Sequence, residues 1–477
     1  MYPDRCCTPL RTPFVQQCLY VNYRITSKAN LHQRQVGFSE TNLPPTIRDA
    51  CFAALNLNIS YIWIDCLCIV QDDAEEWALE APKTGSVYNG SIVTIAATST
   101  ASGHGGLFNT QSSSILPRDP DREITLGGRL TSGSSSILRI TRPHASKTET
   151  DAWAVQIVGA PLMRRSWVCQ ERLSSPRIIH YTSAQLFWEC EHCTLSEDNA
   201  IVSSGKLATD TRPRLLLLSL YQSRVSEEWH ISPAEYSRLH PLNQWYGDFI
   251  DNQYSRCSLT FQHDKLIAVS GLARLIHDKT SIPYFAGHWF PDERWFLSSL
   301  CWHRDSAGAK TREYRAPSWS WASQDSAVTF YGLGASAASL HSRVVHVSVE
   351  PAATFGSLYA GETVLEGPLL LIELRYIPYT NMWDAPSYAN GFSTGPEFHY
   401  LDDDIEPPSD MVSHALALTS KDAYGNPWRL VYFLILEEVI EPAEILTMKR
   451  VGFGITSTDS EWERELLGAP ATRVRTI

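Results

Sequence analysis

The chain has 477 residues, of which 43% are hydrophobic, 11% aromatic and 19% charged. This composition excludes a disordered, collagen-like or low-complexity protein and supplies enough apolar surface for at least one large core. The net charge of −12 argues against nucleic acid or an anionic membrane as the main partner. Phosphate binding requires clustered Lys and Arg, and the sequence shows no such cluster.

The sequence carries no pattern for secretion or for a membrane span. Residues 1–7 (MYPDRCC) lack the charged start and apolar run of a secretory signal. The longest apolar runs, around 215–218 and 369–372, are far shorter than the roughly 20 residues that a membrane helix needs. The eleven cysteines are odd in number and irregularly spaced, which is typical of reduced thiols. We therefore expect a cytoplasmic protein.

Residues 42–98 have the pattern of an α/β unit. Pro44 and Pro45 open a segment whose apolar residues recur at helical spacing, and residues 61–64 (YIWI) predict a short buried strand. A second helical pattern runs from Ala74 towards Tyr88, and residues 91–97 (SIVTIAA) predict the next strand. The two strands begin about 30 residues apart, which is the length of a right-handed βαβ unit. We predict a parallel, Rossmann-like sheet flanked by helices.

The rest of the chain alternates between loop, strand and helix patterns. Residues 99–136 are rich in Ser, Thr and Gly, which indicates a loop or an insertion. Alternating patterns predict strands at 137–140, 153–158 and 318–321, a short helix at 164–173, and a β-hairpin from 177–182 and 185–190. Further segments predict helices at 215–221, 245–254 and 264–277, and strands at 369–374 and 430–436. The chain thus ends in a helical and then a β-rich region.

Three motifs that could suggest chemistry are weak. The run 103–106 (GHGG) lacks the preceding strand, the Lys and the following helix of a phosphate loop, so a turn is the simpler interpretation. Residues 190–193 (CEHC) supply half of a zinc site, but no second pair stands at a fitting distance. A Cys–His nucleophile with Cys169 or Cys66 stays open, although nothing nearby marks either thiol as activated.

The clearest candidate chemistry is acidic. Asp65 ends the predicted central strand, and ligands of open parallel sheets bind beyond the carboxyl ends of the strands. Asp72 and Asp73 follow in the same loop, where a helix cap is a simpler role than a ligand contact. Glu80 shares a helix face with Trp77, and a Glu beside a buried aromatic ring can act as acid or base. A solvated surface Glu is the alternative.

Residues 164–173 (RRSWVCQERL) bring Arg165, Glu171 and Arg172 close to the indole of Trp167. The simpler interpretation is an Arg–Glu pair and a stacked Trp that join the helix to the sheet. An anion pocket for a phosphate or a carboxylate is the alternative.

Taken together, these motifs resemble the fungal heterokaryon-incompatibility (HET) domain. The similarity lies in residues 43–50 (LPPTIRDA), 61–73 (YIWIDCLCIVQDD), 77–88, 94–97 (TIAA), 161–173 and 188–190 (WEC). Within them the family motifs comprise Trp63, Asp65, Gln71, Asp72, Trp77, Arg165, Trp167, Gln170, Glu171 and Arg172. Residues 264–273 and 315–323 are similar to the region that often follows this domain in long family members.

The resemblance implies a protein of fungal non-self recognition, in which mismatched partners trigger growth arrest or cell death. It implies a protein partner or self-association. It also implies a HET domain over 26–193, after an atypical N-terminus (1–25) and before a helical region (194–335) and a β-rich region (336–477).

HET domains are in turn similar to Toll/interleukin-receptor (TIR) domains, some of which cleave NAD with a Glu on a helix. By that analogy Glu80 would act as acid or base, and Asp65 would orient a ribose hydroxyl of NAD. This fold-level analogy implies an NAD or nucleotide hydrolase as the alternative function.

Two departures from the family pattern leave a third interpretation open. The family's opening Leu-Ser-Tyr-x-Trp-Gly motif is missing from residues 1–25. Pro82 falls inside the helix that carries Glu80, where an interior Pro costs ~3 kcal/mol or kinks the helix. Thr84 also stands where the family usually has Met. On these grounds the chain would be an inactive, truncated copy.

Overall fold

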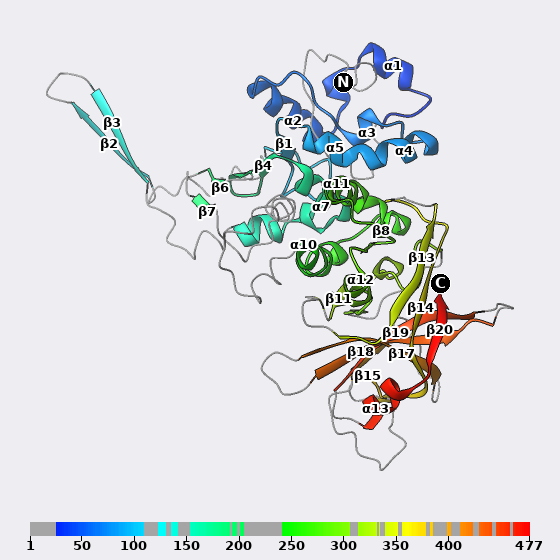
Figure 1. Cartoon of the computed structure of the whole chain (residues 1–477). Helices are drawn as coiled ribbons and strands as arrows, with labels where there is room; N and C mark the ends of the chain where they lie inside the picture. Colours follow the sequence, from blue (N-terminus) through cyan, green and yellow to red (C-terminus); the bar gives the residue numbers. More distant parts are fainter. Residues whose placement is uncertain are drawn as a thin grey trace. The chain divides into compact units, whose positions relative to one another are not determined.

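The computed structural model describes residues 25–108, 123–129, 135–141, 153–190, 193–197, 201–204, 241–305, 313–331, 333, 339–351, 355–377, 382–384, 398–401, 411–422, 429–440, 445–457 and 461–477. The chain divides into two units, residues 1–210 and 211–477 (Figure 1). Each unit has its own strands and its own buried apolar clusters.

Short helices form the first part of the first unit. They are α1 (Leu31–Val36), η1 (Glu40–Asn42), α2 (Pro45–Asn56) and α3 (Asp65–Cys68). α2 begins with a Pro in its first turn, and its buried residues Ile47, Ala50, Cys51 and Ala54 recur at helical spacing. The first helix predicted from the sequence is therefore confirmed.

The second predicted helix is interrupted near its middle. α4 (Ala74–Glu80) is followed by a 3-10 turn, η2 (Ala81–Lys83), and then by α5 (Thr84–Asn89). The Asp73 side chain caps α4 by accepting hydrogen bonds from the backbone N–H groups of Glu75 and Glu76, at 3.1 and 3.2 Å. The break falls at Pro82, because a Pro has no backbone N–H to donate a helical hydrogen bond.

Five strands form the main sheet of this unit, in the order β1-β4-β5-β6-β7. Their bounds are Thr94–Ala96, Arg177–Tyr181, Leu186–Cys190, Cys193–Ser196 and Ile201–Ser204. β1 and β4 are parallel, and every other neighbouring pair is antiparallel. The predicted hairpin is confirmed as β4 and β5, and the predicted strand at 137–140 lies in β3.

A separate two-stranded ladder joins β2 (Glu123–Arg129) and β3 (Ser135–Thr141). Helical turns η4 (Ala154–Val158) and η5 (Pro161–Arg164) then lead to α7 (Ser166–Ser174). α7 corresponds to the short helix predicted at 164–173.

Two predictions for this unit are wrong. Residues 61–64 form no strand, because no described segment supplies the ladder partner that a strand needs. Among the described residues of this unit, β1 and β4 are the one parallel pair in a mixed α/β arrangement, and the predicted parallel, Rossmann-like sheet is not confirmed. Residues 153–158 form a π-helical turn instead of a strand. Trp153 and Ile157, four residues apart, are both buried there, and short apolar runs do not distinguish helix from strand.

From residue 241 to residue 330, the described part of the second unit consists of helical turns and short strands. Its helices are α10 (Pro241–Asn243), η6 (Gln244–Asp251), η7 (Tyr254–Arg256), η8 (Gln262–Lys265), η9 (Ile267–Val269), α11 (Ser270–Thr280), α12 (Glu293–Ser299) and η10 (Trp321–Ser323). The short strands are β8 (Tyr284–Phe285), β9 (His288–Trp289), β10 (Trp302–Arg304) and β11 (Val328–Phe330). The helical predictions at 245–254 and 264–277 are confirmed, and residues 215–221 lie outside the described residues.

The strand predicted at 318–321 is wrong, although its buried indoles are present. The segment is a turn followed by η10, and both Trp319 and Trp321 are fully buried. The Trp321 Nε1–H donates to the Gly287 carbonyl at 3.0 Å, so the indoles pack into the core without a ladder.

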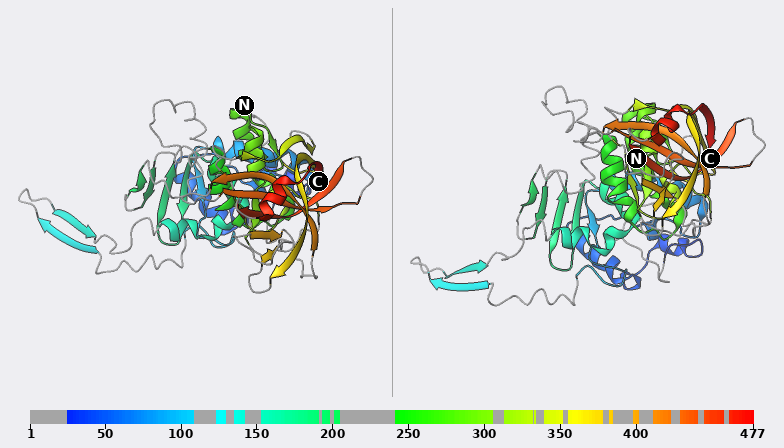
Figure 2. Two further views of the ribbon diagram at one scale, coloured as in Figure 1. Left: turned by 60° about the horizontal axis from the view of Figure 1, so that its bottom comes forward. Right: turned by 90° about the horizontal axis from the view of Figure 1, so that it is seen from below.

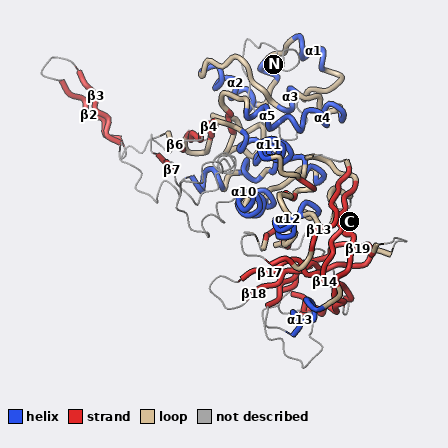
Figure 3. Tube along the Cα trace, in the orientation of Figure 1, coloured by secondary structure: helices blue, strands red, loops and turns tan. Residues whose placement is uncertain are grey.

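A β-barrel closes the C-terminal part of the second unit (Figure 2 gives two further views, and Figure 3 shows its strands in red). β14 pairs with β17, β17 with β18, β18 with β19, β19 with β20, and β20 again with β14. These strands are β14 (Ala360–Ile377), β17 (Met411–Asp422), β18 (Arg429–Glu438), β19 (Leu446–Ser457) and β20 (Ala471–Thr476). Strands β12 (Ser339–Leu340), β13 (Arg343–Glu350), β15 (Met382–Asp384) and β16 (Phe398–Leu401) extend it.

Side chains fill the barrel. Leu374, Phe433 and Val451 share a buried cluster with Trp462 and Leu466 of α13 (Glu461–Gly468), so the interior is a packed core. Gly454 lies opposite Phe433 in the β18–β19 ladder, and a Cβ there would lie 2.1 Å from the Phe433 ring. The predicted strands at 369–374 and 430–436 are confirmed within this barrel.

Candidate functional site

The first group of the candidate site is the Asp65 carboxylate at the start of α3. Ile64 precedes it in an extended conformation, and Asp65 Oδ1 accepts a hydrogen bond from the Cys66 backbone N–H at 2.7 Å. Burial raises the pKa of Asp65, although the Cys66 N–H and the charge of Arg165 act in the opposite direction. Asp65 is therefore half-buried at the position where the sequence predicts a carboxylate that faces a ligand.

Glu171 on α7 is the second carboxylate of this cluster. Burial raises the pKa of Glu171 to about 7, and the nearby charge of Asp65 raises it further. The charge of Arg165 and a hydrogen bond from the Tyr88 hydroxyl act in the opposite direction. Tyr88 comes from α5 and is 3% exposed, and burial raises the pKa of its hydroxyl well above the usual value. α3, α5 and α7 thus gather two carboxyl groups, a phenol and a guanidinium, which we call the acid cluster: Asp65, Tyr88, Arg165 and Glu171.

Aromatic side chains hold the three helices around the acid cluster. Trp63 meets Tyr88 edge to face, with the ring centroids 5.8 Å apart. Trp77 of α4 meets Trp167 of α7 in the same way, also at 5.8 Å. These contacts support the interpretation of Trp167 as a stacked residue that joins elements of the fold.

A second buried network lies on the other side of α7. Arg172 donates to both oxygens of Glu189 on β5, through Nε at 2.9 Å and Nη2 at 3.3 Å. His180 Nε2 on β4 lies 2.9 Å from Glu189 Oε2, and its Nδ1 lies 3.0 Å from the Thr98 hydroxyl. Burial alone would raise the pKa of Glu189, but Arg172 and His180 hold it far below its usual value. We call these four residues the paired cluster.

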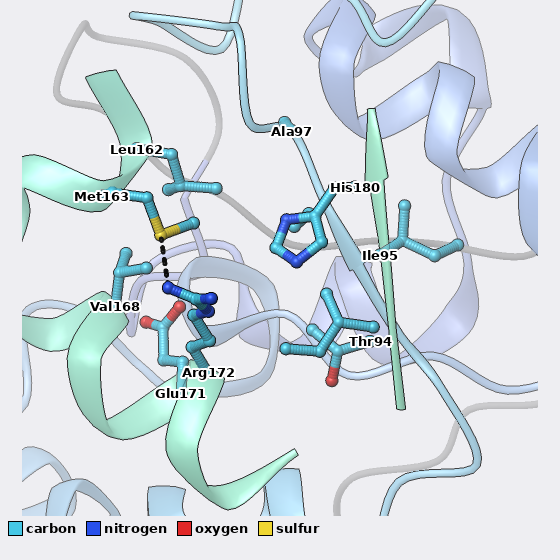
Figure 4. Close-up of a pocket in the computed structure, with 11 residues that line it drawn as sticks. Thr94, Ile95, Ala97, Leu162, Met163, Val168, Glu171, Arg172 and His180 are labelled. Carbon is cyan, nitrogen blue, oxygen red and sulfur yellow. Dashed lines mark hydrogen bonds between the residues drawn. The ribbon is translucent and has the colours of Figure 1, made fainter. Parts of the chain in front are cut away.

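A small cavity lies beside the two clusters and is lined by both Glu171 and Arg172 (Figure 4). Its volume is about 20 Å³, and the close-up shows Arg172 directed towards the sulfur of Met163 with His180 on the opposite wall. A space of this size accepts about one water molecule. A carboxyl group with a pKa near neutrality is suited to proton transfer, but this cavity has no room for a nucleotide.

The remaining candidate residues contribute no side chain to the acid cluster. The Gln71 side chain donates to the carbonyls of Asp65 and Ile69, at 3.3 and 3.1 Å, and so shapes the loop after α3. Asp72 Oδ1 accepts from the Lys28 backbone N–H at 2.8 Å. Glu80 is partly exposed and forms an ion pair with Lys83 at 2.7 Å. Gln170 is fully buried on α7.

Sequence reasoning missed Glu189, His180 and Thr98. The sequence held a signal for two of them. His180 and Glu189 occupy buried positions of the hairpin that alternate with more exposed ones, next to the buried Ile178 and Phe187. A charged residue at such a position requires a buried partner. The predicted Arg–Glu pair that joins the helix to the sheet is confirmed, and Arg172 forms it with Glu189 of the hairpin.

Two further findings concern cysteines and metals. Cys66 is disulfide-bonded, which corrects the expectation that the thiols are all reduced. Among the described residues, no group of three or more His, Cys, Asp or Glu side chains could hold a metal ion. His192 of the 190–193 run lies outside the described residues.

Residues 20–171 match the family model of the heterokaryon incompatibility protein (HET). The chain carries a HET domain. The match includes Asp65, Tyr88, Arg165 and Glu171, the whole acid cluster, whereas His180 and Glu189 lie beyond it. No curated protein and no solved structure matches the chain. Within the part of the chain that the structure describes, no helix is long and apolar enough to cross a membrane.

Proposed function

We propose that this protein acts in fungal non-self recognition and cell-death signalling, and that its HET domain works by binding another protein chain. The HET match supports the biological class. The observation that carries the mode of action is a row of aromatic rings on the first unit, formed by Phe52, Phe108 and Tyr181.

The aromatic row is partly exposed and contiguous. Phe52 is 61% and Phe108 43% exposed, yet their rings meet edge to face at 5.8 Å. Phe108 meets Tyr181 at the same distance, and Leu55 of α2 is also exposed. Contiguous exposed apolar surface marks interaction sites, and aromatic residues dominate the binding energy of protein interfaces.

The fold holds the aromatic row in place before any partner arrives. The Asp49 carboxylate on α2 accepts hydrogen bonds from the backbone N–H groups of Leu107 and Phe108, at 2.8 and 3.4 Å. Gly106 adopts φ +73°, and a Cβ there would lie 2.7 Å from Asp49 Oδ2. The loop that carries Phe108 is thereby fixed to the helix that carries Phe52, which lowers the entropy cost of binding.

The surface around Trp63 is less suited to this role. Trp63 is half-buried against Tyr88, and its exposed neighbour is Tyr61. We therefore place the association surface at the aromatic row.

Expression of the full chain in a fungal host tests the proposal. We expect the wild-type protein to arrest growth and Phe52→Glu to relieve the arrest, because a carboxylate in the aromatic row opposes burial. Val155→Glu is the matched control, since Val155 is a 74% exposed apolar residue of the same unit outside the row. Circular dichroism confirms that both variants fold. Full toxicity of folded Phe52→Glu, or no toxicity of the wild type, would overturn the proposal.

A further inference from the structure

The second unit contains a cleft that has no role in the function proposed above. Its volume is about 660 Å³, within the range of about 300–1,000 Å³ typical of small-ligand sites. Residues between 313 and 324 supply one part of its lining, and the paired ends of β13 and β14 supply another. The cleft is thus built from segments that are distant in sequence.

Close packing holds these two parts of the lining together. A Cβ at Gly361 of β14 would collide with the ring of Pro317, so the two chains pass each other at a distance that only a glycine permits. Arg315 anchors the same segment, because its Nε donates to the Ala322 carbonyl at 2.5 Å and its Nη1 forms an ion pair with Asp325 at 2.5 Å. The cleft is therefore formed before a ligand arrives, which lowers the entropy cost of binding.

The basic residues of the lining are engaged elsewhere. The Arg315 charge is neutralised by Asp325. Arg450 is 1% exposed, stacks on Trp302 and donates to backbone carbonyls of the core. Lys449 has an interaction of its own. Among the residues that line the cleft, no cation is thus left for an anionic ligand.

Two carboxylates of the lining have no counter-ion. Glu313 and Glu350 are exposed, and no residue in the described ranges forms an ion pair or a side-chain hydrogen bond with either of them. Glu362, by contrast, lies 3.5 Å from Arg475. A metal ion is a poor partner for the two carboxylates, because the described residues hold no group of three or more His, Cys, Asp or Glu that could bind one. An organic cation is the better fit.

An exposed tyrosine accompanies each of these carboxylates. Tyr314, which is 51% exposed, follows Glu313 in the chain. Tyr359 is 79% exposed, and its backbone N–H donates to the Glu350 carbonyl at 2.7 Å. Both tyrosines line the cleft, and neither ring contacts another ring in the described part of the chain. The face of an aromatic ring attracts cations, and the best-known use of this interaction is the recognition of quaternary ammonium groups.

We propose that this cleft binds a ligand with a quaternary ammonium group, which lies against Tyr314 and Tyr359 and is neutralised by the carboxylates of Glu313 and Glu350. The group belongs either to a free choline-like molecule or to a trimethylated lysine side chain. The site would give the second unit a ligand of its own, independent of the aromatic row.

Isothermal titration calorimetry on the full chain tests this inference. The probes are choline, its neutral isostere 3,3-dimethylbutan-1-ol, and the peptide acetyl-Ala-trimethyllysine-Ala-amide. We expect the isostere to bind more than about 10-fold more weakly than choline, because it has the same shape without the charge. Tighter binding of the peptide than of choline would assign the group to a modified lysine, and the reverse order would assign it to a free molecule. The inference fails if neither cation binds, or if the isostere binds as well as choline.

Two pairs of variants localise the site. Glu350→Gln should weaken choline binding about 3- to 10-fold, because one counter-charge is lost. Glu373→Gln is the matched control, since Glu373 is a strand glutamate of the same unit that does not line the cleft. Tyr359→Leu should weaken binding about 2- to 5-fold through the lost ring. Its control is Tyr61→Leu, at a 56% exposed tyrosine of the first unit, which should leave binding unchanged. Equal effects within either pair would overturn the inference.

Discussion

Glu171, which is half-buried, and Glu189, which is fully buried, are two carboxyl groups of the same unit with opposite behaviour. Glu189 receives two hydrogen bonds from Arg172 and one contact from His180, and its pKa lies far below the usual value. Glu171 is the residue next to Arg172, yet its pKa is raised to about 7, chiefly by burial. Burial alone therefore does not decide the charge of a carboxyl group; the number and geometry of its donors do.

The difference follows from the geometry of α7. Successive residues of a helix point about 100° apart, so Glu171 and Arg172 enter different environments. Arg172 reaches the hairpin, where the forked guanidinium matches the carboxylate of Glu189. Glu171 meets Asp65, a second acid, and Tyr88, so like charge adds to the effect of burial. The paired cluster is a structural link, and the acid cluster is the one that titrates near neutral pH.

The largest expected effect comes from Glu189→Gln. The change leaves the Arg172 charge buried without its counter-ion, which should cost about 3–5 kcal/mol of unfolding free energy. Chemical denaturation measures it. The double variant Arg172→Met with Glu189→Leu should lose much less, because it removes both charges. Equal losses in the single and double variants would show that packing, and not pairing, stabilises this cluster.

Glu171→Gln should change the pH dependence of stability. The folded pKa of about 7 lies above the unfolded value of 4.5, so the unfolded state ionises first as pH rises. The stabilising contribution of protonated Glu171 is therefore fully present below pH 4.5. The free energy of unfolding then falls by a few kcal/mol as the pH rises to about 7. Asp65, whose pKa is also raised, adds to the same trend. Denaturation between pH 5 and 8 should show this decline in the wild type.

Glu171→Gln should reduce the decline and be more stable than the wild type at pH 8. Glu189, whose folded pKa is lowered, contributes stability above its unfolded pKa of 4.5 and loses it only at strongly acid pH. It should therefore add no slope between pH 6 and 8. An unchanged slope in Glu171→Gln would refute the difference between the two carboxyl groups.

The smallest effect is expected for Glu80→Gln. Glu80 pairs with Lys83 at the surface, and an exposed pair of this kind contributes less than about 1 kcal/mol. If the HET domain acts by association, the purified chain should release no nicotinamide from NAD, and Glu80→Gln should behave like the wild type. Release that depends on Glu80 would instead support the hydrolase alternative.

Local patterns in the sequence predicted the local elements of the first unit. α2, α7, the β4–β5 hairpin and the cap at Asp73 follow from helical spacing, alternation and capping preferences. Local patterns could not show whether the predicted parallel sheet forms. A strand at 61–64 depends on a neighbour elsewhere in the chain, and no described strand pairs with it.

The sequence predicted several residues of the candidate site, but it did not predict which residues contact one another. Asp65, Arg165 and Glu171 were selected, and the structure gathers them. Tyr88 was not assigned to this group, because its contact with Glu171 depends on the packing of α5 against α7. An Arg–Glu pair between the helix and the sheet was predicted, but Glu189 was not named as the partner, because the pair joins residues 17 apart through the β4–β5 turn.

The central claim of this account is that Glu171 keeps its proton near neutral pH while Glu189 does not. Infrared difference spectra of the full chain at pH 6 measure this through the carbonyl stretch of a protonated carboxyl group. The account predicts that this band is diminished in Glu171→Gln and unchanged in Glu189→Gln. A band that persists fully in Glu171→Gln, or that disappears in Glu189→Gln, would contradict it.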